Sequence, residues 1–234
     1  LINKGIFTSC KKNDSCPPWS IKSKLIKHDK IKKTIYYEHA TLKIYDIPVF
    51  YFPKFFHPDP TVKRQSGFLN PTFTNSTAVG AGFGLPYYWA ISHDKDLTFT
   101  TKTYKDENMI FFNEFRQAFK NGFLTLDASF TEGYSNISST KTKGSRSHVF
   151  TNLDLDFAKD KDRDYESNFS LQTQKTSNDT YFRIHDIDTG LVDSSETNLV
   201  NKINYNYKKN NTFLNISGSV YEDLRKTSDR YEYI

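Results

Sequence analysis

The stretch "HVFTNLDLDFA", residues 148–158, alternates apolar and polar side chains over the length of a long β-strand. A period of two is typical of a strand with one apolar face. The same rhythm returns in "YESNFSLQTQ" (165–174), "NLVNKINYNYKK" (198–209) and "TFLNISGSVYED" (212–223). In the first stretch, the alternation places on one face Val149, Thr151, Leu153, Leu155 and Phe157, and on the other Asn152, Asp154 and Asp156. In the third, it assigns Leu199 and Ile203 to the apolar face.

These segments are about twice as long as the ~5–6 residues of an ordinary strand. About ten residues is the length that a tilted strand needs to cross a bilayer. Lys202 shares its parity with Asn204 and Asn206, so it falls on the polar face. A charge there costs little, whereas a charge facing lipid at mid-membrane costs ~2–4 kcal/mol. A soluble sandwich would show the same alternation, so the length favours a membrane β-barrel without excluding the sandwich.

The connections give an independent signal. Counting strands from about Ser66, the two long connections, residues 133–147 and 176–196, are the fifth and the seventh, and the even-numbered ones are all short. Outer-membrane barrels have short periplasmic turns and long external loops. If the first strand rises from the periplasm, this parity predicts that both long loops face the cell exterior.

The composition limits the class of protein. The 234 residues carry a net charge of +5, with 20 Phe and 15 Tyr, and such aromatic content does not suit a disordered chain. The longest strongly apolar run, "IPVFYFP" (47–53), is far too short for a membrane-spanning helix. No signal peptide is recognisable, and the chain begins without Met and stops inside a predicted strand, so we expect a fragment of a longer protein. No nucleic-acid partner is expected.

Residues 19–56 have shorter alternating segments, which predict a soluble β layer. Trp19, Ile21 and Leu25 alternate with polar residues, as do Leu42 and Ile44. Upstream, "CKKNDSCPPW" holds the two cysteines, Cys10 and Cys16. With no second cysteine pair and six scattered histidines, no metal site and no cofactor is predicted. An exported protein would oxidise these thiols, but the sequence leaves open with what each would pair.

Between the two parts lies "HPDPTVKRQSGFLNP", residues 57–71. Pro58 and Pro60 restrict their own φ and that of the preceding residue, which predicts a stiff, extended hinge. Gly67 would allow the bend into the first long strand. Lys63 and Arg64 either meet lipid phosphates or form a solvated charge pair. Pro71 and Pro86 fall in the first and second long strands, where each removes a ladder hydrogen bond. They mark either bulges or a strand pair that must open, and the glycines before Pro86 would loosen it further.

At this point the residues carry a resemblance. "FTSC", "PPWSIKSKLIKHD", "YYEHATLKIYDIPVFYFPKFFHPDPTVKRQSGFLNP" and "LPYYWAISHDKDLTFTTKTY" resemble the LPS-assembly protein LptD family of the Gram-negative outer membrane. The "HPDPTVKRQSGFL" form is similar to the α-proteobacterial branch, and the close match covers about residues 7–116.

The resemblance implies an all-β architecture in which residues 1–60 are the last rungs of a periplasmic β-jellyroll and residues 61–234 the first nine or ten strands of a large, incomplete barrel. It implies an outer-membrane translocon that receives lipopolysaccharide from a bridge protein of the LptA type. A plug lipoprotein of the LptE type would fill the barrel, and the lipid would leave through a lateral gate. Pro71 and Pro86 would weaken that gate, and Cys10 would form a long-range disulfide, although Cys16 leaves a local bridge open. The candidates for the acyl-chain path are Trp19, Ile21, Leu42, Ile44, Val49 and Phe50.

Two other classes of protein compete. An outer-membrane enzyme would need a nucleophile beside a base, but no G-x-S-x-G stretch occurs and no histidine falls in a recognisable constellation, so no enzyme is predicted. A general porin would lack the N-terminal layer and the strand prolines, and single-channel conductance would identify it.

Overall fold

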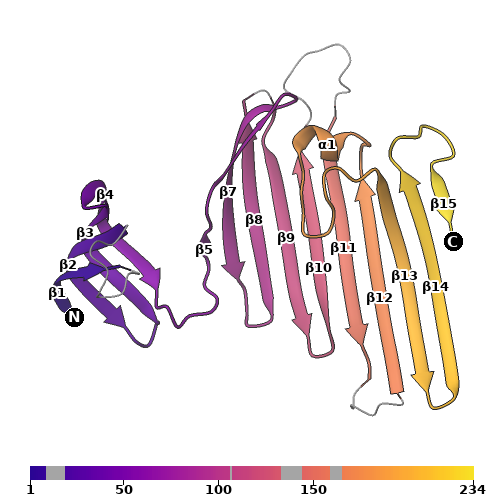
Figure 1. Ribbon diagram of the computed structural model, residues 1–234, viewed down its shortest axis with the longest axis horizontal. Helices are drawn as coiled ribbons and strands as arrows, with labels where there is room; N and C mark the ends of the chain where they lie inside the picture. Colours follow the sequence, from indigo (N-terminus) through magenta and orange to yellow (C-terminus); the bar gives the residue numbers. More distant parts are fainter. Residues whose placement is uncertain (9–18, 106, 133–143, 159–164) are drawn as a thin grey trace. The chain divides into compact units, whose positions relative to one another are not determined.

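The computed structural model describes the chain except for residues 9–18, 106, 133–143 and 159–164. Its described residues are almost entirely antiparallel β-structure, which confirms the predicted all-β fold (Figure 1). The chain divides into two compact units, residues 1–65 and 66–234, a boundary five residues beyond the one predicted at 60/61. None of the described helices is long and apolar enough to cross a membrane.

Unit 1 is a four-stranded meander in the order β1-β2-β3-β4. The strands are β1 (Ile2–Phe7), β2 (Trp19–Asp29), β3 (Thr34–Ile44) and β4 (Ile47–Pro58). Its core is formed by Ile21, Ile26, Tyr37 and Ala40, with aromatic side chains such as Phe52 and Phe55 packed against them.

A row of four residues interrupts this meander where the strands pair. One residue in each strand of this row forms no pair with its neighbour across the sheet: Lys4, Lys24, His39 and Pro53. Two of them, Lys4 and His39, have positive φ values of 57° and 50°. A left-handed residue breaks the strict alternation of a strand. Neither left-handed residue lies in β2, but the buried positions of β2 also shift by one across the row, because paired residues share a face. Ile26 is buried beyond it, and the predicted continuation of the apolar face to Leu25 is wrong.

Unit 2 is a single antiparallel meander that ends with β15 (Tyr231–Tyr233) at one edge. Its long strands are β7 (Gly80–Ala90), β8 (Lys95–Tyr104), β9 (Ile110–Phe119), β10 (Gly122–Thr131), β11 (Arg146–Asp156), β12 (Tyr165–Thr176), β13 (Asn198–Lys209) and β14 (Thr212–Asp223). They contain 10 to 12 residues each, as the alternation predicted.

The first strand of unit 2 is split in two. Two pieces, β5 (Gly67–Phe68) and β6 (Thr72–Ser76), both pair with β7 and together form the other edge of the sheet. After the turn that follows β6, β7 begins at Gly80, whose φ of 75° is a conformation that glycine adopts without strain.

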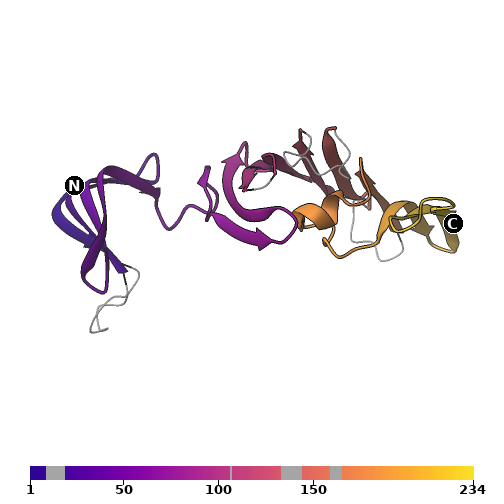
Figure 2. The same ribbon diagram turned by 90° about the horizontal axis from the view of Figure 1, so that it is seen from above.

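The connection between β12 and β13 contains the one α-helix of the described residues, α1 (Tyr181–His185). We call residues 177–197 the strap. They lie on one face of the sheet (Figure 2), where they pack against Ile110 of β9, Phe150 of β11 and Leu199 of β13. Because the strands form a meander, β10 and β12 end at the same end of the sheet, so the connections that follow them start there, as their parity predicted. No helix was expected in this connection.

Candidate functional site

The sheet of unit 2 has two chemically different faces. Residues directly opposite each other in an antiparallel sheet share a face. Along β7, the side chains of Phe83, Leu85, Tyr87 and Trp89 lie on one face and are 37–52% exposed. Away from the strand ends, this apolar face continues across the sheet through Phe99, Phe111, Val149, Ile203 and Ile216.

The opposite face is polar. Asp96, Asp127, His148 and Gln174 lie on it and are buried. Lys202 faces Gln172 and Ser219, on the polar face as predicted. Large apolar side chains exposed on one face, with charged groups collected on the other, are the pattern that strands of an outer-membrane barrel show.

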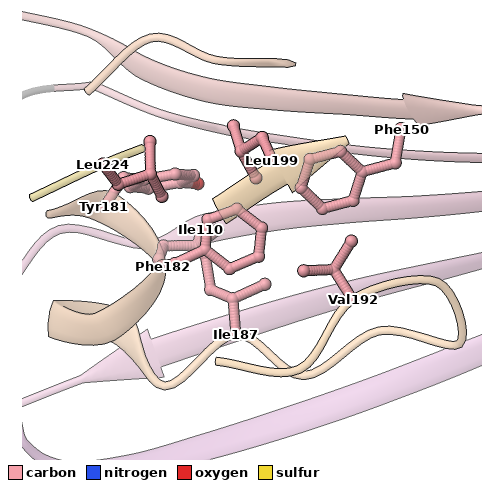
Figure 3. Close-up of a cluster of buried hydrophobic side chains, with 8 residues drawn as sticks. All are labelled: Ile110, Phe150, Tyr181, Phe182, Ile187, Val192, Leu199 and Leu224. Carbon is pink, nitrogen blue, oxygen red and sulfur yellow. The ribbon is translucent and has the colours of Figure 1, made fainter. Parts of the chain in front are cut away.

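The strap covers part of the polar face with an apolar cluster (Figure 3). Tyr181, Phe182, Ile187 and Val192 of the strap join sheet residues and pack into a fully buried group. The members contributed from outside the strap are Ile110, Phe150, Leu199 and Leu224. The ring centroids of Phe150 and Phe182 lie 5.0 Å apart in a stacked arrangement. Leu199, which the alternation assigned to the exposed apolar face, is 1% exposed and lies in this cluster, so that assignment is wrong.

Beneath the strap, a chain of buried polar side chains connects it to the sheet. Asp127 Oδ1 lies 2.6 Å from His148 Nε2, and His148 Nδ1 lies 2.6 Å from Ser129 Oγ. The same Ser129 oxygen lies 2.7 Å from the hydroxyl of Tyr181. An Asp–His–Ser group could serve nucleophilic catalysis, but Ser129 is only 4% exposed and Tyr181 closes it from any substrate. The group therefore ties the strap down, and sequence spacing gave no sign of it.

The first strand is broken where the prolines lie. Gly67 and Phe68 pair with Tyr88 and Tyr87, whereas Thr72 pairs with Gly84. Three residues, Leu69 to Pro71, therefore stand opposite two, Leu85 and Pro86. One extra residue in one strand is a β-bulge, which bends the strand and locally disrupts the ladder. The structure thus brings Pro71 and Pro86, predicted to act together, into one defect.

The orientation of Pro86 shows which ladder loses a bond. The Leu69 N–H donates to the Pro86 carbonyl oxygen at 2.9 Å. Since the N and C=O of a strand residue point to the same side, the missing N–H of Pro86 faces the first strand and not β8. The weakness therefore falls between β5–β6 and β7, and the pairing of β7 with β8 continues through Pro86 and Thr100.

A cavity of about 370 Å³ lies on the polar face next to this defect. It is bounded by Thr72 and Thr74 of the first strand and by Asp186, Asp188 and Gly190 of the strap. Strands β8 to β10 supply the rest of the wall, including Lys102, Glu114 and Asp127. Its charged side chains are mostly acidic, with Glu114, Asp127, Asp186 and Asp188 against Lys102.

The predicted hinge is only partly extended. Pro58 is the last residue of β4 and pairs with Thr34. Pro60 lies in a turn, in which the Val62 N–H donates to the Asp59 carbonyl oxygen at 2.9 Å. Two hydrogen bonds from Thr61 to Asp59 Oδ1 hold the pKa of that carboxyl below its ordinary value. Gly67 does not have a positive φ, so its backbone conformation does not require glycine.

Five of the six acyl-path candidates share one face of unit 1. Trp19 lies opposite Ile44, Ile21 opposite Leu42, and Leu42 opposite Phe50. Val49 is the extra residue of a bulge in β4 and lies outside this row, which separates it from the others. Ile21 is buried, whereas Ile44 and Phe50 are 44% and 64% exposed. This apolar row therefore continues past the core onto the surface of the unit.

The cysteines and the question of a metal site remain. Cys10 and Cys16 are outside the described residues. Among the residues that are described, no group of three or more His, Cys, Asp or Glu side chains is arranged to hold a metal ion.

Fold and surface together define the class: an all-β protein in which a small sheet precedes a long-stranded antiparallel meander with one apolar and one polar face, of the kind from which outer-membrane barrels are built. The model of the LptD protein family matches residues 35–231, which include the second half of unit 1 and nearly all of unit 2, and the chain belongs to that family.

Individual relatives agree with this assignment. The chain is 39% identical over 100 residues to the LPS-assembly protein LptD of Shewanella denitrificans, covering 43% of this chain and 13% of that protein. It is 31% identical over 172 residues to the protein of the same name from Nitrosococcus oceani, covering 70% and 23%. It is 34% identical over 126 residues to the LPS-assembly protein LptD of Yersinia pestis, covering 54% of this chain and 16% of that protein. The chain therefore spans less than a quarter of the length of these relatives.

Proposed function

We propose that this chain is the junction of an outer-membrane lipopolysaccharide translocon, at which the lipid passes from the periplasm to the outer leaflet. The relatives named above are LPS-assembly proteins, and the apolar face of unit 2 suits contact with lipid chains. Unit 1 is the periplasmic end of a jellyroll that receives lipopolysaccharide from a bridge protein of the LptA type. Its row of Trp19, Ile21, Leu42, Ile44 and Phe50 carries the acyl chains.

The observation that carries the proposal is the broken first strand. A closed barrel should avoid unmade backbone bonds, because each costs several kcal/mol in lipid. Here the edge strand holds a bulge with Pro71 on one side and Pro86 on the other, and the missing N–H of Pro86 faces that bulge. An edge built in this way suits a seam that parts sideways to release a lipid. The polar face behind it then accommodates the hydrophilic part and a plug lipoprotein of the LptE type.

The test is Pro71→Ala together with Pro86→Ala in the full-length protein. Restoring the donors should strengthen the first strand, so the barrel keeps its heat-modifiable mobility on gels while lipopolysaccharide delivery to the cell surface slows. Cells should become sensitive to large hydrophobic antibiotics at a normal protein level. Pro48→Ala, in β4 of unit 1, is the matched proline control.

Wild-type delivery by a folded double variant would show that the prolines only mark the bulge. If single-channel recordings of the folded protein also showed general solute conductance, a porin function would replace the proposed one.

A further inference from the structure

The side chain of Tyr104 links the strap to a row of residues that begins at the first strand. Tyr104, the last residue of β8, donates its hydroxyl hydrogen to the carbonyl oxygen of His185 in the strap, at 3.1 Å. In the register of the sheet, Tyr104 lies opposite Gly82, and Gly82 lies opposite Thr74 of the first strand. These residues form one row on the polar face, from the edge strand to the strap.

Gly82 is the position at which this row is tightest. A Cβ atom there would lie 2.5 Å from Thr74 Oγ1 and 3.0 Å from two carbons of the Tyr104 ring. The backbone of Gly82 does not have a positive φ, so the need for glycine comes from space and not from conformation. Thr74 Oγ1 is itself buried, without a hydrogen-bond partner among the described residues. The hydroxyl is therefore held there by packing.

The next row repeats the arrangement. Thr72 lies opposite Gly84, and a Cβ atom at Gly84 would lie 2.4 Å from Thr72 Oγ1. Both threonines of β6 thus lie over glycines of β7. The sequence suggested that these glycines loosen the strand, but the packing argues the opposite: the missing side chains let the first strand approach β7 closely.

We propose that Gly82 and Tyr104 are positioning residues that hold the first strand against β7 and connect its position to the strap. The inference deepens the proposed function and rests on it, since a seam that opens must also be able to close. The bulge at Pro71 and Pro86 weakens the first strand between β5 and β6. The two Thr–Gly pairs then hold β6 close to β7. The bond from Tyr104 to the strap fixes the position of the ring beside Gly82. Loosening the strap should therefore loosen the packing of Thr74 against Gly82.

The experiment measures the closeness of the two strands directly. Phe73→Cys and Phe83→Cys place two thiols at directly opposed positions on the apolar face, in the full-length protein in outer-membrane vesicles. Their oxidation to a disulfide is followed by peptide mass spectrometry, which separates this bond from those of the native cysteines. The rate is compared with and without Gly82→Ala. The matched control is Gly218→Ala in β14, where a Cβ atom would meet only Ile203 Cγ2 at an ordinary 3.7 Å.

We expect Gly82→Ala to slow disulfide formation roughly tenfold, because overpacking a tight contact displaces its neighbours. Gly218→Ala should leave the rate unchanged. Adding Thr74→Ala to Gly82→Ala removes the 2.5 Å conflict and should restore most of the rate. Tyr104→Phe, which keeps the ring but loses the bond to His185, should give a smaller reduction in a protein that still folds.

An equal rate in Gly82→Ala and Gly218→Ala would refute the inference, as would a slowed rate that Thr74→Ala does not restore. Surface lipopolysaccharide is measured in the same strains. If cross-linking falls as expected while delivery and antibiotic resistance stay at wild-type levels in every variant, the packing inference stands and the proposed lateral opening is wrong.

Discussion

The substitution Phe150→Ala tests whether the strap is a packed part of the sheet or a loop that merely rests near it. Phe150 is fully buried on the polar face. Its ring stacks on Phe182 of the strap at 5.0 Å and on His148 of its own strand at 4.4 Å. Removing the ring therefore takes away the main sheet surface on which α1 lies.

The size of the effect follows from these two contacts. Phe→Ala in a core costs ~3–5 kcal/mol in total. Because the ring packs partly on the strap and partly on its own sheet, we assign about half, ~2 kcal/mol, to the strap. Since 1.4 kcal/mol is a factor of ten, the population of the detached strap should rise roughly thirtyfold.

Trypsin reports on this opening at one bond. Arg183, in α1, is the only lysine or arginine among residues 177–197. The helix must leave the sheet before the protease can hold this bond in an extended form, so cleavage follows the population of the open strap. We expect cleavage after Arg183 in the purified full-length protein to accelerate by about the same thirtyfold.

The neighbouring residue supplies the control. Val149 is 46% exposed on the apolar face, so Val149→Ala should leave cleavage at Arg183 unchanged. Equal cleavage rates in Phe150→Ala and wild type would refute the reasoning, because the strap would then be held without the cluster. Hydrogen bonds such as the chain from Asp127 to Tyr181 and the bond from Tyr104 to His185 would then hold it.

Two further predictions concern unit 1. Burial raises the pKa of Tyr37 to about 12, so its ionisation should appear as a late step in the alkaline ultraviolet titration that is missing in Tyr37→Phe. Because the folded pKa is raised, this contribution to stability is complete below the ordinary value near 10 and is lost as the pH rises through about 12. In an oxidising compartment Cys10 should be bonded, so Cys10→Ser should shift the full-length protein on a non-reducing gel; unchanged mobility with a free wild-type thiol would contradict this. Cys16→Ser, compared in the same way, identifies a local bridge.

The alternation of side chains determined most of what the sequence could determine. Successive antiparallel strands run in opposite directions, and this places the starts of the two long connections at one end of the sheet. The faces of the long strands in unit 2 and the place of Lys202 follow from a side-chain period of two. That period is a property of the extended backbone itself, so it needs no knowledge of neighbouring strands. The motif around residues 57–71 likewise indicates the family from the sequence, and the family model agrees.

Tertiary structure decided the places where the backbone stops being regular or where distant segments meet. His39 adopts a positive φ and shifts the buried face of unit 1, so Ile26 replaces Leu25 in its core. Pro71 and Pro86 are fifteen positions apart, and only strand pairing shows that they share one bulge. The sequence predicts the strap as an outer loop, because Tyr181 and Phe182 lie among polar residues. Their packing partners come from distant strands and are not visible in the local sequence. Local periodicity is a property of one segment, whereas a bulge, a buried cluster and the space at Gly82 depend on which segments fold against each other.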